Sequence, residues 1–129
     1  KLGAVHGFAG VLGGMFEAPH GAICARLLPP TMVVNVRALQ ARDPENPAIE
    51  KYREVAQVVT QNGSATIQEG VQWVQSLGDD LQIAPLSTYG ISSADFDSII
   101  EKSAVSSSMK GNPLPLTNDE LAEILQAAM

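Results

Sequence analysis

The sequence predicts an all-α fold. Several segments place apolar residues three and four positions apart, which is the spacing of one face of an α-helix. No segment shows the sustained alternation of apolar and polar residues that is typical of a half-buried strand. Clusters of proline, glycine and asparagine separate the helical segments, as turn residues do. With 129 residues, 45% of them hydrophobic, the chain can bury one core.

The first two helical segments are the most apolar part of the chain. Residues 1–17 carry no charge apart from Lys1 and Glu17, which is typical of a helix enclosed on all sides. A second apolar segment runs from Gly21 to about Leu39. Pro29-Pro30 interrupts it, and we expect these prolines to end or kink the helix.

Two amphipathic helices are predicted next, after a turn-rich linker at residues 43–47. The first begins at Pro47, runs to about Gln61, and is ended by the turn residues 62–64. The second runs from Thr66 to about Leu81. Their apolar faces consist of Ile49, Tyr52, Val55, Ala56 and Val59, and of Ile67, Val71, Val74 and Leu77.

The remaining elements are shorter. Residues 83–91 are expected to form a connecting loop. Ser92-Ser93 can cap a helix through about Ala104, with Phe96, Ile99 and Ile100 buried. Thr117 followed three residues later by Glu120 fits a capping box, and predicts a last helix to Met129.

Composition excludes several classes of protein. The net charge of −6 is unfavourable for a nucleic-acid surface, which is basic. The sequence shows no secretory signal and no run of about 18 apolar residues to span a membrane. One cysteine cannot form an internal disulfide. We therefore expect a cytoplasmic protein without nucleic-acid or membrane partners.

His6 and His20 are the only histidines, and they are fourteen positions apart. On one straight helix they would be separated by about 21 Å, too far to share a metal ion with bonds of about 2 Å. Glycine relaxes the backbone and proline is tolerated at a helix start, so Gly13-Gly14 and Pro19 provide for a bend. Two helices, the second beginning at His20, could then bring both rings together.

The chain resembles the iron-containing alcohol dehydrogenases in these and neighbouring motifs. The resemblance is strong over residues 1–36 and 111–129 and weak between them. A closing segment, residues 111–117 followed by a short amphipathic helix, matches the end of the family's sequences. The N-terminal matches are His6-Gly7-Phe8-Ala9, Leu12-Gly13-Gly14-Met15-Phe16, Pro19-His20-Gly21 and Leu27-Leu28-Pro29.

The resemblance implies a fold, a partial domain and a metal. The fold is the C-terminal helical bundle of the dehydroquinate synthase-like enzymes, and residues 1–129 would form a single, incomplete helical metal-binding domain without the N-terminal dinucleotide-binding domain. The family binds its metal through an aspartate and three histidines. Only the last two histidines have counterparts, His6 and His20, which become candidate ligands for Fe²⁺ or Zn²⁺. NAD or NADP would be bound mainly by the missing domain.

Each candidate ligand has a plainer interpretation. His6 could be a core histidine bonded to a backbone carbonyl, and His20 an exposed turn histidine. Cys24 lies one helical turn after His20 and could form a soft His-x-x-x-Cys site, but the family has no ligand there, and a packing role is expected. Glu17 is interpreted as an exposed acid at a helix end.

Two further positions are candidates by resemblance. Many members carry a histidine, assigned to proton transfer near the nicotinamide and substrate, where this chain has Gly10. Gly10 is thus a candidate cofactor-binding position without a side chain, and no catalytic residue is assigned. Ser108 falls where some members line the substrate pocket, although residues 106–108 can equally be plain loop.

The resulting prediction is the metal-ligand part of an NAD(P)-dependent alcohol dehydrogenase that oxidises alcohols or reduces aldehydes and ketones. The alternative is a non-catalytic helical interaction module descended from such an enzyme. We expect the chain alone to be inactive and, with two imidazoles only, to bind metal weakly. We also expect a homo-oligomer, because residues 1–17 would present an apolar surface.

Overall fold

The computed structural model describes residues 2–129, and its regular elements there are all helices. This confirms the predicted all-α class. The α-helices are α1 (Ala4–Met15), α2 (His20–Arg42), α3 (Pro47–Thr60), α4 (Ile67–Asp80), α5 (Phe96–Ala104) and α6 (Asn118–Ala128). Three short 3₁₀ helices are η1 (Leu86–Tyr89), η2 (Ser93–Asp95) and η3 (Met109–Gly111).

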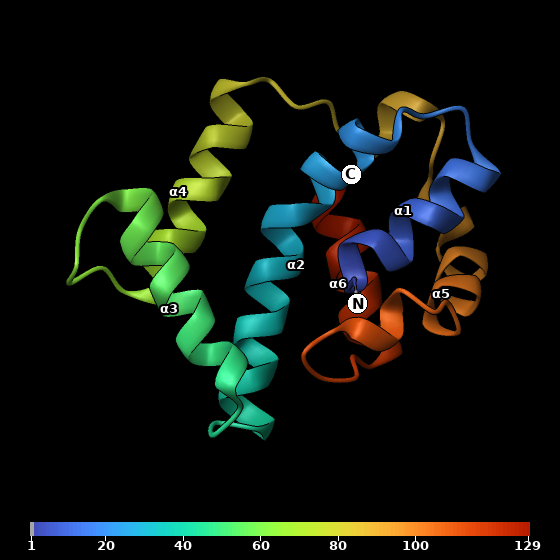
Figure 1. Ribbon diagram of the computed structural model, residues 1–129. Helices are drawn as coiled ribbons and strands as arrows, with labels where there is room; N and C mark the ends of the chain where they lie inside the picture. The colour runs from blue at the N-terminus through green and yellow to red at the C-terminus, as the bar shows by residue number, and fades with distance from the viewer. Residues whose placement is uncertain (1) are drawn as a thin grey trace.

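The long helix α2 lies at the centre of the molecule (Figure 1). The α3–α4 pair packs on one side of α2, α1 and α6 pack on the other, and α5 packs against α1 and α6. The main core fills the second side, with fully buried side chains from all four helices, among them Phe8, Leu12, Ile23, Leu27, Ile99 and Leu125. This core fixes α1 against α2, the two helices that carry the histidines.

Helix α2 continues through Pro29 and Pro30 as one helix, so of the two expected effects of the prolines, an end or a kink, the end is wrong. Each proline removes one backbone donor, which frees the carbonyls of Ala25 and Arg26. A pocket of about 440 Å³ borders all four residues, so water can reach those carbonyls. The buried residues on both sides of the prolines, Leu27 and Val34, hold the helix together by packing.

Helix α1 buries one face and exposes the other. Phe8 and Leu12 are fully buried, whereas Gly10, Gly13 and Gly14 are exposed. The expected enclosure on all sides is therefore not found in this chain, and the exposed strip consists of glycine, not of large apolar side chains. The glycines 13–14 also lie inside the helix, so the bend is made by residues 16–19 instead.

The α3–α4 pair is closely packed at one point. A side chain at Gly70 would collide with Ala56, so the backbones approach each other there. The predicted apolar faces are only partly correct, because Val55 is 45% and Leu77 40% exposed. These two side chains point away from the small cluster that α3 and α4 form with α2.

The predicted caps are confirmed. The Thr117 amide donates to Glu120 Oε2 at 2.8 Å, and the Glu120 amide donates to Thr117 Oγ1 at 3.2 Å. Ser92 caps η2, which leads directly into α5. Ile99 and Ile100 of α5 are buried as expected, and Phe96 is partly buried against the core.

One helix, α2, is long and apolar enough to cross a membrane by length and composition alone. The expectation that the chain has no apolar run of this length is therefore wrong for residues 20–42. Half of its most apolar stretch is buried in the fold, as in the core helix of a globular domain.

Candidate metal centre

Helix α1 positions His6 in its first turn, close to the start of the closing segment at Gly111 and Asn112. The α1 N-terminus is held by Asn112, whose Oδ1 accepts a hydrogen bond from the Ala4 amide at 3.2 Å. On the other side of the helix, Gly7 lies so close to Met109 that a Cβ at residue 7 would be 2.9 Å from the methionine Cε. His6, itself half-buried, is therefore carried on a helix turn that is fixed from two directions.

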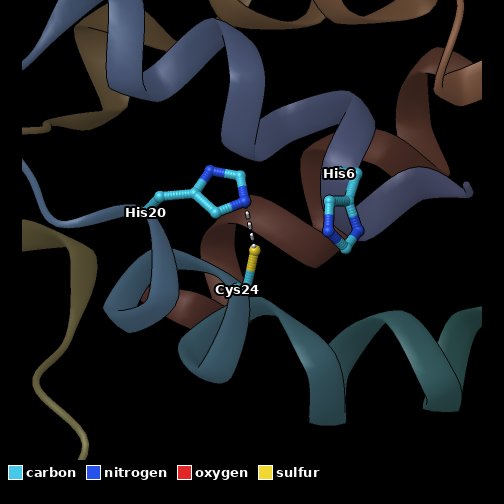
Figure 2. A group of neighbouring side chains, drawn as sticks. All are labelled: His6, His20 and Cys24. Atoms are coloured by element: carbon cyan, nitrogen blue, oxygen red, sulfur yellow. Dashed lines mark hydrogen bonds between the residues drawn. The ribbon is translucent and has the colours of Figure 1, made fainter.

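His20 is the first residue of α2, as predicted, and its ring is exposed. The turn at residues 16–19 brings it back to α1, so that the centroids of the His6 and His20 rings are 5.5 Å apart with a tilt of 54° (Figure 2).

Cys24 lies one turn further along α2, beside the same two rings (Figure 2). Its Sγ is 3.5 Å from His20 Nε2, and the ligand atoms of His6, His20 and Cys24 all lie within 4.8 Å of one another. Partial burial raises the pKa of the Cys24 thiol, which keeps it protonated at neutral pH in the absence of a cation. Sequence reasoning considered this residue but expected packing only.

An open pocket of about 520 Å³ adjoins this cluster, and His6 and Cys24 form part of its wall. The pocket extends along α2 past Thr31 to Asn35 and Tyr52. Its lining is mostly apolar, and Leu28 at its edge is 42% exposed. A small organic molecule with one polar end could therefore lie against the cluster.

Comparison with known proteins identifies the family. A sequence profile described as Fe-containing alcohol dehydrogenase family, C-terminal, matches residues 1–129. The chain belongs to the iron-containing alcohol dehydrogenase family. This confirms the resemblance drawn from the histidine motifs.

Relatives within the iron-containing alcohol dehydrogenases are similar over nearly the whole chain. The 1,3-propanediol dehydrogenase of Citrobacter freundii is 31% identical, over 99% of this chain and 32% of that protein. The lactaldehyde reductase of Escherichia coli (strain K12) is 29% identical, over 98% and 32%. The chain thus spans about a third of the length of the relatives it matches.

Solved structures agree with the fold. A crystal structure of 1,3-propanediol oxidoreductase superposes with a TM-score of 0.83 at 27% identity, over 99% of this chain and 33% of that one. An alcohol dehydrogenase from Oenococcus oeni gives 0.81 at 30% identity, over 100% and 33%. The chain has the C-terminal helical fold of iron-containing alcohol dehydrogenases.

The other candidates taken from the family lie outside this cluster. Gly10 is exposed, with open space where its side chain would be. Ser108 is half-buried and precedes η3. Neither residue lines the pocket that His6 and Cys24 border. Glu17, the nearest acid to His20 in the sequence, is exposed and does not belong to the ligand cluster among the described residues.

Sequence reasoning missed a pair of side-chain amides that support the site. Asn112 Nδ2 donates to Asn35 Oδ1 at 2.8 Å, and Asn35 Nδ2 donates to Asn112 Oδ1 at 3.2 Å. Asn35 is 3% exposed and also donates to the Tyr52 hydroxyl at 3.2 Å. The only signal was an asparagine on the apolar helix α2, where a buried polar side chain needs partners.

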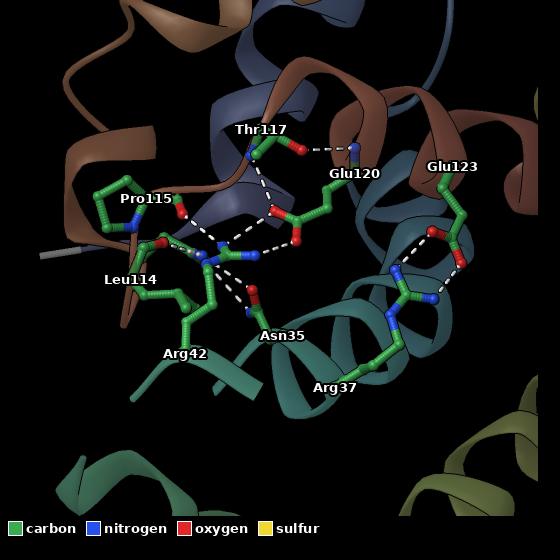
Figure 3. Close-up of polar contacts among 9 residues, drawn as sticks. Asn35, Arg37, Arg42, Leu114, Pro115, Thr117, Glu120 and Glu123 are labelled. Atoms are coloured by element: carbon green, nitrogen blue, oxygen red, sulfur yellow. Dashed lines mark hydrogen bonds and ion pairs between the residues drawn. The ribbon is translucent and has the colours of Figure 1, made fainter. Parts of the chain in front are cut away.

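Two ion pairs join α2 to the closing helix α6 nearby (Figure 3). Arg37 makes two hydrogen bonds with Glu123 at 2.7 and 2.6 Å. Arg42 pairs with Glu120, whose side chain is 13% exposed. Hydrogen bonds from these arginines hold the pKa values of Glu120 and Glu123 below their usual range.

Proposed function

We propose that this chain is the metal-ligand-bearing C-terminal part of an NAD(P)-dependent, metal-dependent alcohol dehydrogenase, with His6 and His20 as two of the metal ligands. In this proposal, residues 1–129 are one incomplete helical domain. The dinucleotide-binding domain is supplied by further sequence, as the length of the relatives suggests. The whole enzyme would oxidise alcohols or reduce aldehydes and ketones.

The convergence of the two histidines from different helices is the observation that carries the proposal. Ring centroids 5.5 Å apart allow one nitrogen of each ring to face a common point. A core histidine whose ring nitrogen is hydrogen-bonded to a backbone carbonyl would need no second imidazole beside it. The donor set fits a divalent transition ion, because imidazole suits both iron and zinc.

The residues of the chain hold and orient the reacting groups. When bound, a divalent ion at such a site polarises an alcohol or carbonyl oxygen as a Lewis acid. His6 and His20 would fix its position from two helices that the main core holds together. The pocket beside His6 would take the apolar part of a small alcohol or aldehyde against its mostly apolar wall.

The remaining parts of the proposal concern cofactors and surroundings. NAD or NADP would bind mainly to the other domain, near Gly10, and Ser108, which lies outside the pocket beside His6, would line a part of the substrate site completed by that domain. The metal would be Fe²⁺ or Zn²⁺. The net charge of −6 favours small-molecule partners over nucleic acid, and we place the enzyme in the cytoplasm, without membrane partners.

Turnover of the whole enzyme tests the proposal. His6→Ala and His20→Ala should each lower kcat roughly a thousandfold, because several kcal/mol of Lewis-acid stabilisation are lost. Glu17→Gln, an exposed acid outside the cluster, is the matched control and should leave kcat unchanged. If both histidine variants fold, retain metal and keep normal turnover, the ligand assignment is wrong, and the alternative of a non-catalytic helical module is favoured.

A further inference from the structure

We propose that Cys24 is a third protein ligand, so that His6, His20 and Cys24 together bind a borderline-soft divalent cation such as Zn²⁺. This inference rests on the proposed function, which takes the two histidines as ligands. It goes further by adding a thiolate where the family's aspartate-and-histidine ligand set has none.

The distances agree with a shared ion. In a tetrahedral zinc site with bonds of about 2.05 Å to nitrogen and about 2.3 Å to sulfur, neighbouring nitrogen and sulfur atoms are about 3.5 Å apart. The Cys24 Sγ is 3.5 Å from His20 Nε2. The ligand atoms of the three residues lie within 4.8 Å of one another, so the remaining pairs need to approach by at most about 1.3 Å to reach the ligand-to-ligand spacing of a shared ion.

The backbone positions of the three residues are fixed by the fold. His20 and Cys24 are one turn apart on α2, and therefore lie on the same face of that helix. His6 approaches from α1, which the main core packs against α2. A preformed arrangement of this kind lowers the free-energy cost of bringing three ligands together on binding.

The adjoining pocket leaves one side of this cluster open. His6 and Cys24 form part of its wall, and so does Thr31, which is 4% exposed. The Thr31 hydroxyl has no hydrogen-bond partner within residues 2–129. Thr31 lies two helical turns beyond Cys24, about 10 Å along α2, so its buried hydroxyl is a polar position in the wall of this pocket at some distance from the three ligand atoms.

A thiolate ligand has chemical consequences. The Cys24 thiol gives up its proton to the solvent when the sulfur–metal bond forms, so binding releases one proton. Thiolate and imidazole together favour zinc over iron(II), because soft ligands select the softer ion. The site then resembles catalytic zinc sites with three protein ligands and one open position.

Cobalt(II) titration of the 129-residue chain tests the inference, because Co²⁺ reports its ligands by absorption. We expect one equivalent to bind, with a sulfur-to-cobalt charge-transfer band in the near ultraviolet. Cys24→Ser and Cys24→Ala should abolish that band and weaken binding at least tenfold, with helicity unchanged by circular dichroism. Glu17→Gln should bind cobalt like the unaltered chain.

The outcomes separate this inference from the proposed function. In one outcome, cobalt binds without a charge-transfer band and equally well in Cys24→Ala, while still requiring His6 and His20. That result overturns the cysteine ligand and leaves the two histidine ligands in place. Binding that is indifferent to His6→Ala overturns both. Absence of any spectral change up to millimolar cobalt overturns the three-ligand site in this chain.

Alkylation of the unaltered chain gives a second measurement that does not depend on a folded variant. Cys24 is the only cysteine, so iodoacetamide reports on it alone. One equivalent of Zn²⁺ should slow the reaction at least tenfold, and His6→Ala should remove this protection. Equal alkylation rates with and without zinc would contradict the proposal.

Discussion

Asn112 and Asn35 face each other through two amide hydrogen bonds of 2.8 and 3.2 Å, although they are 77 positions apart in the sequence. The same Asn112 oxygen caps the Ala4 amide at the start of α1, and its Nδ2 also donates to the Leu114 carbonyl at 2.9 Å. This one side chain therefore connects the closing segment to both helices that carry the candidate ligands.

Removal of that connection should destabilise the fold. We expect Asn112→Ala to lower the free energy of unfolding by about 1–3 kcal/mol, because it leaves the buried Asn35 Oδ1 without the amide donor of Asn112. Urea denaturation measures this. Asn118→Ala, an exposed asparagine at the start of α6, is the control and should change stability by less than about 0.5 kcal/mol. Equal effects of the two substitutions would mean that the amide pair does not stabilise the fold.

The capping box at α6 offers a second test. Thr117→Ala should destabilise by about 1 kcal/mol, because the Glu120 amide loses its side-chain acceptor at the helix start. Thr88→Ala, at an exposed position, is the matched control. Thermal unfolding should show a lower midpoint for Thr117→Ala only. An unchanged midpoint would show that water replaces the cap without cost.

Stability should fall in acid through the ion pairs of α6. The pKa values of Glu120 and Glu123 are lowered in the folded chain by hydrogen bonds from Arg42 and Arg37. A lowered folded pKa contributes stability that is present above the unfolded value of about 4.3, and is lost as pH falls through the folded values. The urea unfolding midpoint of the chain, measured between pH 6 and pH 2, should therefore decrease as the pH falls below about 4.3.

Two variants locate this effect. Glu120→Gln and Glu123→Gln should each make the decrease in acid shallower, because their carboxylates no longer take up a proton on unfolding. Glu54→Gln is the control, since Glu54 has no ion-pair partner among residues 2–129. If all three variants keep the slope of the unaltered chain, the α2–α6 ion pairs do not determine acid stability.

Self-association is expected through α3 and α4, where large apolar side chains are exposed, and not through the glycine strip of α1. Val58 of α3 is 74% exposed, and Leu81 after α4 is 62% exposed. Light scattering during gel filtration should show a dimer or a larger species at micromolar concentration. Val58→Lys should shift it towards the monomer. Val105→Lys, at an equally exposed valine outside this pair, should not. A monomer in every case would refute the expected assembly.

The features that sequence predicted well depend on neighbouring residues. The Thr117 box and the helix start at His20 follow from residues a few positions apart, and both are found. The meeting of His6 and His20 also follows from a short turn. Cys24 was within reach of the same reasoning, because its spacing from His20 is one helical turn.

The features that sequence missed depend on distant contacts. The continuity of α2 through Pro29-Pro30 requires packing on several helices, which outweighs the lost backbone hydrogen bonds. The exposure of Val55 depends on which face of α3 meets α2. The role of Asn112 needs Asn35 on another helix, and helical periodicity carries no information about such a pair.

The central claim is that His6 and His20 bind one metal ion together. The most direct measurement is ¹⁵N NMR of the imidazole nitrogens during titration with Zn²⁺. The chain has two histidines, so His6→Ala assigns both rings. We predict that one nitrogen of each ring shifts with the same zinc dependence, and that both changes saturate together. Rings that respond at different zinc concentrations, or a response from only one of them, would contradict the claim.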